Sequence, residues 1–457
     1  MKIMKFKTVN PATEQIIGEY ETMERQEVLK ITDDSTRAFV EWKNLGISQR
    51  AGHFKKLAMV LRKNKNNYSK LMTLEMGKPI KQSLGEVEKC AWTAEVYAEK
   101  TGEWLEDEIV EADGKNHMVS FEPLGTILSI MPWNFPFWQA LRFAIPTLMA
   151  GNVSILRHSN VVPQCALAIE EAFKESGFPE NVFRTIITDH DAISDLIKSD
   201  HIQGVSLTGS TGAGSRVAEL AGKNLKKVVL ELGGSDPFIV LEDANIENAA
   251  RNAVTGRTIN SGQSCIAAKR FIVNEKIFEE FSKIFSENIG KLIVDDPMKM
   301  DTDVGPLVNR EGLIQMEDFM KDAISRGAKM LTGGSKLDMK GYFFKPAVLV
   351  NVTTDMKVLK DEVFGPIAPV IMVKSDEEAL KIANDSKFGL GASVWTDDFG
   401  KGMKIAKKLE AGDVFINSIV KSDPRMPFGG IKKSGIGREL SKYGLKEFVN
   451  VKGINIY

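Results

Sequence analysis

Cys265 lies in the stretch "NSGQSCIAAKR", residues 260–270, and is one of three cysteines in the chain. A cysteine attacks carbon efficiently only as a thiolate. A lone cysteine is more often a small buried residue of the core. Polar neighbours, and the glycine at 262 that allows another backbone to approach closely, support a reactive thiol, but the stretch taken alone still favours a buried structural cysteine. A helix that restarted after Gly262 would bring positive charge to this thiol, and Lys269 and Arg270 follow closely.

Glu231 stands at the end of an apolar run in "VVLELGGSDP", residues 228–237. A carboxylate is costly to bury in such a strand unless it is paired or functional. Desolvation would raise its pKa, which a general base at neutral pH requires. The alternative is a structural carboxylate that binds nearby backbone amides.

Two further stretches place polar groups where strands should end. Asn134, in "MPWNFPFWQALR" (131–142), carries an amide donor that can stabilise an oxyanion. "SLTGSTGAGSR" (206–216) opens a helix with glycines, and backbone amides at such a position can hold a phosphate. Its spacing matches neither a Walker loop nor G-x-G-x-x-G, so an ordinary helix start explains it equally well.

Hydrophobic periodicity predicts the elements that would position these groups. Apolar residues three and four apart predict helices over 48–107, with a break at Gly77-Lys78-Pro79. From about residue 124, and again from 236, short apolar strands alternate with helices, and Asp243 or Asn245 caps one helix. The pattern predicts an α/β fold of two doubly wound lobes with a cleft between them. We place the first lobe at 1–108 and 124–234 and the second at 235–428.

Composition narrows the class of protein. The 457 residues carry a net charge of −1, and 43% are hydrophobic, as in ordinary folded proteins. A balanced charge gives no sign of a nucleic-acid or membrane-surface binder, and no signal peptide or membrane span is expected. Three distant cysteines suggest a reducing cytoplasm, and the absence of CxxC and HExxH argues against a metal site.

The order of these motifs points to a known family. Pro-Trp-Asn-Phe-Pro, Thr-Gly-Ser-Thr, Glu-Leu-Gly-Gly and Gly-Gln-x-Cys occur in turn, followed by "EVFGP" (362–366) and "PFGGIKKSGIGRE" (427–439). Together they resemble the NAD(P)-dependent aldehyde dehydrogenase superfamily over essentially the whole chain. The resemblance implies a Rossmann-like cofactor lobe and a catalytic lobe. It also implies that Cys265 attacks the aldehyde, that Asn134 and the Cys265 amide hold the oxyanion, and that Glu231 activates the hydrolytic water.

The cofactor region departs from the family pattern. Many relatives have Lys-Pro-Ser-Glu where this chain has Arg157-His158-Ser159-Asn160. Asn160 removes a charge that repels a 2′-phosphate, and Arg157 offers a fork suited to phosphate. We therefore expect NADP to be preferred and NAD to be accepted. The alternative is that Arg157 lies at the solvated end of a strand and does not bind the cofactor. The resemblance assigns cofactor contacts to Met131, Pro132, Trp133, Arg157, His158, Ser159, Asn160, Gly209, Ser210, Gly214, Leu232, Glu362 and Phe364.

The substrate positions resemble those of the short bacterial group that oxidises succinic semialdehyde. Arg142, two helical turns after Asn134, and Ser422 occupy the places where that group binds a distal carboxylate. Ile259 replaces a second arginine of some members, so glutarate semialdehyde, lactaldehyde or other short aldehydes are alternatives. An internal salt bridge is the alternative for Arg142. Trp138 and Phe428 would shape the pocket, or simply pack.

Assembly and redox behaviour follow from the same resemblance. Family members pair through a hairpin and a C-terminal strand, and "HMVSFEPLG" and "FVNVKGINIY" alternate as edge strands do. We expect an oligomerisation arm at 109–123 and 440–457, and a homodimer or homotetramer. Ala267 stands where some relatives have a second cysteine, so no local disulfide switch is expected. A non-catalytic protein with this fold and a cofactor-independent thioester hydrolase are the other classes considered.

Overall fold

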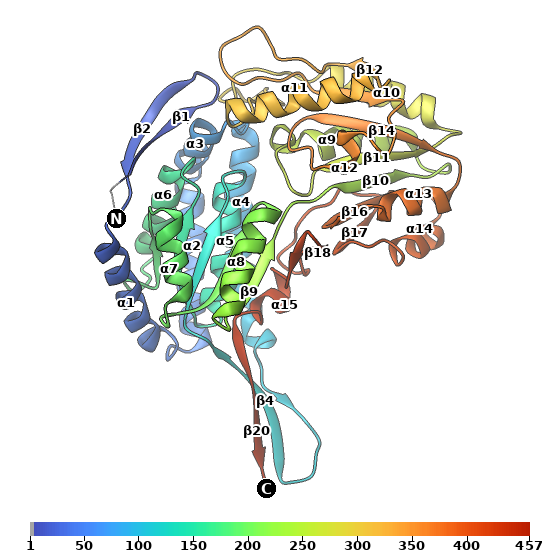
Figure 1. Ribbon diagram of the computed structural model, residues 1–457. Coiled ribbons are helices and arrows are strands. Elements are labelled where there is room, and N and C mark those ends of the chain that lie inside the picture. Colours follow the sequence, from blue (N-terminus) through green and yellow to red (C-terminus); the bar gives the residue numbers. More distant parts are fainter. Residues whose placement is uncertain (1–3) are drawn as a thin grey trace.

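The structure is a computed structural model that describes residues 4–457. Its first lobe is built on a six-stranded sheet (Figure 1). The strands, in spatial order, are β19 (Gly435–Ile436), β9 (Lys227–Glu231), β8 (Ile202–Thr208), β5 (Thr126–Met131), β6 (Val153–His158) and β7 (Phe183–Thr185). All neighbours are parallel except β19. The strand order reverses between β5 and β8, and ligands bind at the carboxyl ends of strands at such a switch point.

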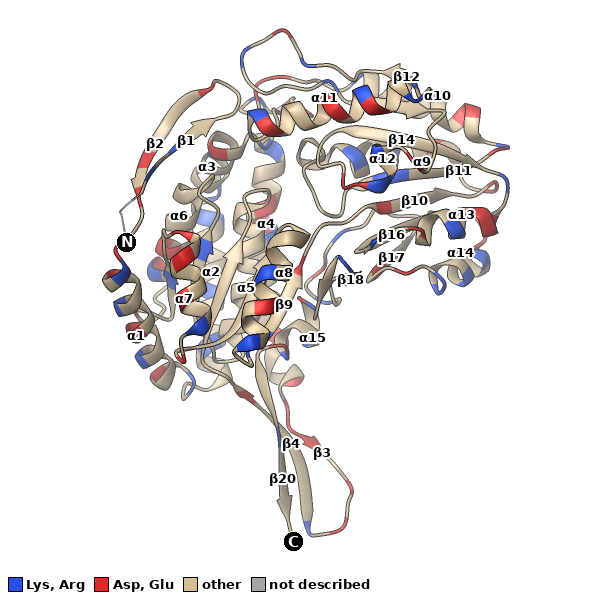
Figure 2. Cartoon of the chain, viewed as in Figure 1, with Lys and Arg blue, Asp and Glu red and all other residues tan. Residues whose placement is uncertain are grey.

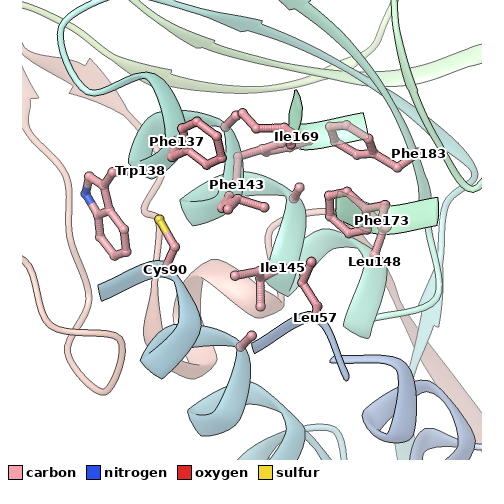
Figure 3. Close-up of a cluster of buried hydrophobic side chains, with 14 of the residues drawn as sticks. Leu57, Cys90, Phe137, Trp138, Phe143, Ile145, Leu148, Ile169, Phe173 and Phe183 are labelled. Carbon is pink, nitrogen blue, oxygen red and sulfur yellow. The ribbon is translucent and has the colours of Figure 1, made fainter. Parts of the chain in front are cut away.

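Helices cover both faces of this sheet. Alternate residues of one strand face opposite sides, so Leu128 packs with α1 and α7, whereas Ile127 packs with α2, α4 and α5. Figure 3 shows part of the second of these cores, including Phe137, Phe143 and Phe173. The helices are α1 (Arg25–Trp42), α2 (Ile47–Lys63), α3 (Lys65–Met76), α4 (Ile80–Trp104), α5 (Pro136–Met149), α6 (Pro163–Glu175), α7 (His190–Lys198) and α8 (Thr211–Lys223).

The helices predicted over 48–107 are confirmed as α2, α3 and α4. The predicted break is also present, because Gly77 ends α3 with a left-handed φ of 80°. A side chain on Gly77 would contact Pro306 and Pro11, so glycine is required there for space as well as conformation. A hairpin of β1 (Lys5–Asn10) and β2 (Gln15–Glu21) precedes α1.

The second lobe is a seven-stranded sheet with helices on both faces. Its strands, in spatial order, are β12 (Lys329–Thr332), β13 (Ala347–Val350), β14 (Ile367–Val373), β11 (Ala268–Asn274), β10 (Asp236–Val240), β16 (Gly391–Trp395) and β17 (Asp413–Ile416). Its helices are α9 (Ile246–Thr258), the 3₁₀ turn η1 (Ile259–Gly262), α10 (Phe278–Gly290), α11 (Arg310–Ser325), α12 (Lys357–Lys360), α13 (Asp376–Asn384) and α14 (Phe399–Ala406). Asn245, rather than Asp243, caps α9.

A small antiparallel sheet projects from the first lobe (Figure 1). It consists of β3 (Glu108–Ile109), β4 (Asn116–Pro123) and β20 (Val449–Ile456). The expected arm begins at residue 440, whereas the projecting strand begins at Val449. The difference arises because α15 (Ser441–Leu445) packs against α4 and α5 of the lobe. A two-stranded sheet of β15 (Phe388–Gly389) and β18 (Ile431–Lys432) lies beside the second lobe.

Charges of both signs are interspersed over the two lobes (Figure 2). Among residues 4–457, no helix has the length and apolar character that a membrane crossing requires.

Candidate active site

Asn134 and Cys265 come from different lobes and meet at the switch point of the first sheet. Asn134 follows β5, and its Nδ2 donates to the Gln263 carbonyl at 3.2 Å. Asn260 reinforces this junction, because its Nδ2 donates to the carbonyls of Asn134 (2.7 Å) and Gln263 (3.1 Å). One prediction needs correction: α5 begins at Pro136, so Asn134 precedes the helix that carries Arg142 rather than lying on it.

The loop before Cys265 has an unusual backbone. Asn260, Ser261 and Gly262 follow one another with φ values of 52°, 56° and 77°. Non-glycine residues in this region are strained, and such strain is held only where the surroundings fix the chain. A side chain at Gly262 would collide with Gly365 of the neighbouring loop. The glycine singled out in the sequence therefore permits the close backbone approach expected of it.

The source of charge at Cys265 differs from the expectation. Cys265 lies in a turn that leads into β11, so the chain does not restart as a helix between Gly262 and Cys265. Lys269 donates to the Ser264 and Cys265 carbonyls at 2.9 and 2.6 Å, and Arg270 donates to Ser235. Burial raises the pKa of Cys265 to about 12, and the positive charges of Arg142 and Lys269 oppose this only in part. Burial therefore favours the protonated form of this thiol.

Two donors are available near this thiol. Within residues 4–457, the Cys265 backbone N–H donates to no acceptor. The Asn134 side chain is buried, and its second N–H is not used by the bond to Gln263. Such donors can stabilise negative charge on a carbonyl oxygen.

Glu231 ends β9 and is almost fully buried, with 2% of its surface exposed. Neither of its oxygens has a hydrogen-bond partner among the described residues. The alternative of a carboxylate bound to backbone amides is therefore not realised. Burial raises the pKa of Glu231 well above its usual range, Arg142 opposes the rise, and the negative charge of Glu439 adds to it.

A cavity of about 240 Å³ lies at the carboxyl ends of β5, β8 and β9. Its walls include seven predicted cofactor residues, namely Pro132, Trp133, Gly209, Ser210, Leu232, Glu362 and Phe364. Ser210 caps α8, and a side chain at Gly214 would collide with Leu232. Glu362 accepts a hydrogen bond from the Gly234 amide at 3.1 Å. Met131, the remaining candidate on β5, is buried, and its carbonyl accepts a hydrogen bond from the Ser159 amide.

The remaining cofactor candidates lie at the end of β6 and do not line this cavity. Arg157 is half-buried, and its Nε has no partner among residues 4–457. Such an uncompensated guanidinium fits a phosphate group. Ser159 and Asn160, both half-buried, follow it.

His158 offers no free ring nitrogen to a cofactor. Its Nε2 bonds the Pro136 carbonyl, and its Nδ1 accepts from the Ser159 amide, both at 2.9 Å. Burial lowers the pKa of His158 to about 4, so the ring is neutral. Its side chain fixes the end of β6 to the start of α5, so the predicted cofactor contact of His158 is open only to its backbone.

A second cavity, of about 300 Å³, lies on the other side of Cys265. All four predicted substrate residues line it, namely Trp138, Arg142, Ser422 and Phe428. Cys265 and Gln139 line both cavities. The thiol thus stands where the two cavities meet.

Arg142 is already paired within the protein. Its guanidinium forms an ion pair with Glu439, and both side chains are at least 95% buried, with 2% and 5% exposed. It also donates to Thr208 at 3.4 Å and stacks on Phe428, 4.8 Å from the ring centroid. The alternative of an internal salt bridge is therefore present, and the role of Arg142 in carboxylate binding stays a prediction.

Lys89 of α4 is a residue of this cavity that the sequence analysis missed. Its Nζ donates to Ser422 Oγ at 2.6 Å and lies 4.2 Å from the centroid of Trp138. In the sequence it is one of several lysines on a long amphipathic helix, and helical periodicity does not show which of them faces a cavity.

Comparisons with known proteins agree with this geometry. The aldehyde dehydrogenase family model matches residues 2–454. A protein from Synechocystis sp. (strain ATCC 27184 / PCC 6803 / Kazusa), named probable succinate-semialdehyde dehydrogenase [NADP(+)], is 46% identical over 451 residues, covering 99% of each chain. A structure of Gox0499, described in terms of its cofactor and substrate selection, superposes with a TM-score of 0.98 at 40% identity and 100% coverage of both chains.

A second solved structure, succinic semialdehyde dehydrogenase from Streptococcus pyogenes in complex with NADP+, has a TM-score of 0.96 at 34% identity over 99% of both chains. The matched family model spans the elements that carry Asn134, Glu231 and Cys265, as well as both cavities that meet at the thiol. The predicted fold and family are thereby confirmed: this chain belongs to the aldehyde dehydrogenase family.

Proposed function

We propose that the protein oxidises succinic semialdehyde to succinate, with NADP as the preferred oxidant and NAD as a weaker one. The observation that carries the proposal is the position of Cys265 between two cavities. One cavity presents the residues expected around a nicotinamide cofactor. The other carries the cationic side chains of Arg142 and Lys89 together with the Ser422 hydroxyl, which suits an aldehyde with a distal carboxylate.

Cys265 acts as the nucleophile in this proposal. The thiol proton passes to solvent water, the sulfur bonds to the aldehyde carbon, and the electron pair of the carbonyl π bond moves to the oxygen, which gives a tetrahedral thiohemiacetal anion. The Asn134 side chain and the Cys265 N–H hold the oxyanion. The cofactor, when bound, supplies the hydride acceptor. Loss of hydride leaves a thioester on Cys265.

Glu231 completes turnover in the proposed mechanism. A deprotonated Glu231 takes a proton from water, the water oxygen bonds to the thioester carbon, and the carbon–sulfur bond breaks to release succinate and the thiol. Its two unpartnered oxygens and elevated pKa support this role.

Cofactor choice rests on the end of β6. Arg157 carries an uncompensated donor, and Asn160 brings no negative charge to the same loop. The Synechocystis relative is named as an NADP(+) enzyme, and the S. pyogenes enzyme was solved in complex with NADP+.

The decisive experiment compares kcat/KM for succinic semialdehyde, propionaldehyde and lactaldehyde, each with NADP and with NAD. The proposal expects the highest value for succinic semialdehyde with NADP. Equal values for all three aldehydes would support a broad short-chain activity instead, consistent with Ile259 and with the internal pairing of Arg142. Strong preference for NAD would contradict the assigned role of Arg157.

We further propose a cytoplasmic homodimer or homotetramer. The projecting sheet of β3, β4 and β20 supports assembly, because its edge strands are exposed and partly apolar, including Val451 and Ile454. Three free cysteines support a reducing compartment. Light scattering coupled to gel filtration measures the mass, and a monomer would contradict the proposal for the arm.

A further inference from the structure

Lys89 projects from α4 into the cavity on the substrate side of Cys265. Its side chain is half-buried, and the Ser422 hydroxyl is its one side-chain hydrogen-bond partner among the described residues. The Trp138 ring lies beneath the ammonium at 4.2 Å. Hydroxyl and aromatic partners orient a cation but do not neutralise it.

The acidic side chains near Lys89 are paired with other groups. Glu86, one turn earlier on α4, is ion-paired with Lys78 and caps α5 by accepting from the Phe137 and Trp138 amides. Asp423, in the loop that carries Ser422, accepts two hydrogen bonds from the Arg425 guanidinium. Among residues 4–457, no carboxylate lies within ion-pair distance of Lys89.

The other groups facing Lys89 do not supply a counterion. Cys90, its neighbour on α4, is buried, which raises the pKa of that thiol well above its usual value and keeps it neutral. Arg142, across the cavity on α5, is itself positive, and its charge is balanced by Glu439. Two cations that line this cavity, Lys89 and Lys421, lack an anionic partner in the described chain, and of the two Lys421 is exposed to solvent whereas Lys89 is half-buried and held by Ser422 and Trp138.

We propose that Lys89, oriented by Ser422 and Trp138, binds the distal carboxylate of the aldehyde substrate and sets the preference for carboxylate-bearing aldehydes. The proposal rests on the function proposed above and deepens it. A partly buried cation without a counterion is costly, and an incoming carboxylate removes this cost while forming a charge-assisted hydrogen bond. Arg142 then shapes the site and its field, rather than acting as the main anchor.

The protonation behaviour of Lys89 is consistent with this role. Burial lowers the pKa of Lys89 to about 8, and the nearby charge of Arg142 acts in the same direction. Glu86 and Asp423 oppose the shift weakly. The positive form, which binds a carboxylate, is thus present at neutral pH and is lost as the pH rises through about 8.

The test uses two substrates of the same length. Succinic semialdehyde carries the carboxylate, and its methyl ester does not. The measured quantity is the ratio of kcat/KM for the acid to kcat/KM for the ester, with NADP saturating. The ionisations of Cys265 and Glu231 affect the reaction of both substrates, so their effects cancel in this ratio. We expect Lys89→Met to lower this ratio about 10- to 100-fold, chiefly through KM, since hydrogen bonds to charged groups contribute on this scale.

Conservative and control variants complete the design. Lys89→Arg keeps a positive charge at all accessible pH values, so it should retain most of the preference. Lys100→Met alters an exposed lysine of the same helix and should leave the ratio unchanged. Circular dichroism and gel filtration establish that each variant is folded. Inhibition by succinate gives a second readout, and its Ki should rise in Lys89→Met in parallel with the ratio.

The outcomes separate this inference from the proposed function. If the unmodified protein does not prefer the acid over the ester, the carboxylate substrate itself is wrong. If it prefers the acid and Lys89→Met preserves that preference, Lys89 is not the anchor, although the proposed function stands. In the unmodified protein the ratio should fall above about pH 8, and a fall of the same size in Lys89→Arg would also contradict the assignment.

Discussion

Arg142 and Glu439 form a buried ion pair that joins α5 to the segment preceding α15. Arg142 lines the substrate cavity, and the charges of both partners act on the pKa of Glu231, so the pair bears on stability and on the charge of the proposed base.

Removing one partner of this pair should destabilise the protein. Arg142→Ala leaves the Glu439 carboxylate buried without compensation, and such changes cost about 3–5 kcal/mol. Urea unfolding followed by circular dichroism measures the free energy of unfolding. Arg25→Ala, which removes a solvent-exposed ion pair with Asp195, is the matched control and should cost at most about 1 kcal/mol. Equal losses of unfolding free energy in the two variants would show that the buried pair contributes no more to stability than the exposed one.

The pH dependence of turnover should respond to Glu439. Its negative charge raises the pKa of Glu231, so Glu439→Gln should lower that pKa. More Glu231 is then deprotonated at a given pH, and the acidic limb of the kcat profile should move to lower pH. A limb that moved to higher pH would contradict this electrostatic coupling.

Glu231→Gln should separate the two halves of the reaction. The amide keeps the size of the side chain but cannot accept a proton from water. We expect one equivalent of reduced cofactor per site in a rapid burst, followed by steady-state turnover at least about 100-fold slower, the scale of general-base catalysis. Rapid-mixing absorbance at about 340 nm, where the reduced nicotinamide absorbs, detects both phases. Loss of the burst itself would place Glu231 in the attack of Cys265 instead.

Alkylation of Cys265 should be slow near neutral pH in the cofactor-free protein. With a pKa of about 12, the thiolate fraction rises about tenfold per pH unit over the accessible range. Mass spectrometry after iodoacetamide treatment gives the rate for each cysteine. Cys90 and Cys165 are fully buried and serve as internal controls, and Cys265→Ala should abolish the labelling that increases with pH. A plateau near pH 7 would mean that the thiol is activated without cofactor.

Arg157 should control the choice between NADP and NAD. Arg157→Ala removes the proposed phosphate contact, so the ratio of kcat/KM with NADP to that with NAD should fall about 10- to 100-fold. Asn160→Glu should lower the same ratio by repulsion. Arg184→Ala, on the adjacent strand β7, removes an arginine that is paired with Glu170 and should leave the ratio unchanged. An unaltered ratio in Arg157→Ala would remove this residue from cofactor selection.

The local sequence was sufficient to predict the helices and strands and to single out the candidate chemical groups. Periodicity predicted α2 to α4 and the alternation of strands and helices, because the spacing of apolar residues directly reports which side of an element is buried. The type and context of Cys265, Glu231 and Asn134 made them candidates, and the resemblance to a known family assigned to them the predicted roles of nucleophile, base and oxyanion donor. Parallel strands bring their carboxyl ends to one edge, which explains why Asn134 and the residues after β8 lie together.

Tertiary packing decided which charges are compensated. Lys89 meets Ser422 across 333 residues of sequence, and Arg142 meets Glu439 through the packing of α15 against α5. It also directed Lys269 to backbone carbonyls and to the Glu362 carboxylate, and it placed Cys265 in a turn before β11 rather than at the start of a helix. A sequence pattern identifies a buried face but not the partner that reaches it from a distant segment. Coulomb interactions and desolvation depend on that partner, so the roles of Arg142 and Lys89 could be assigned only from the folded structure.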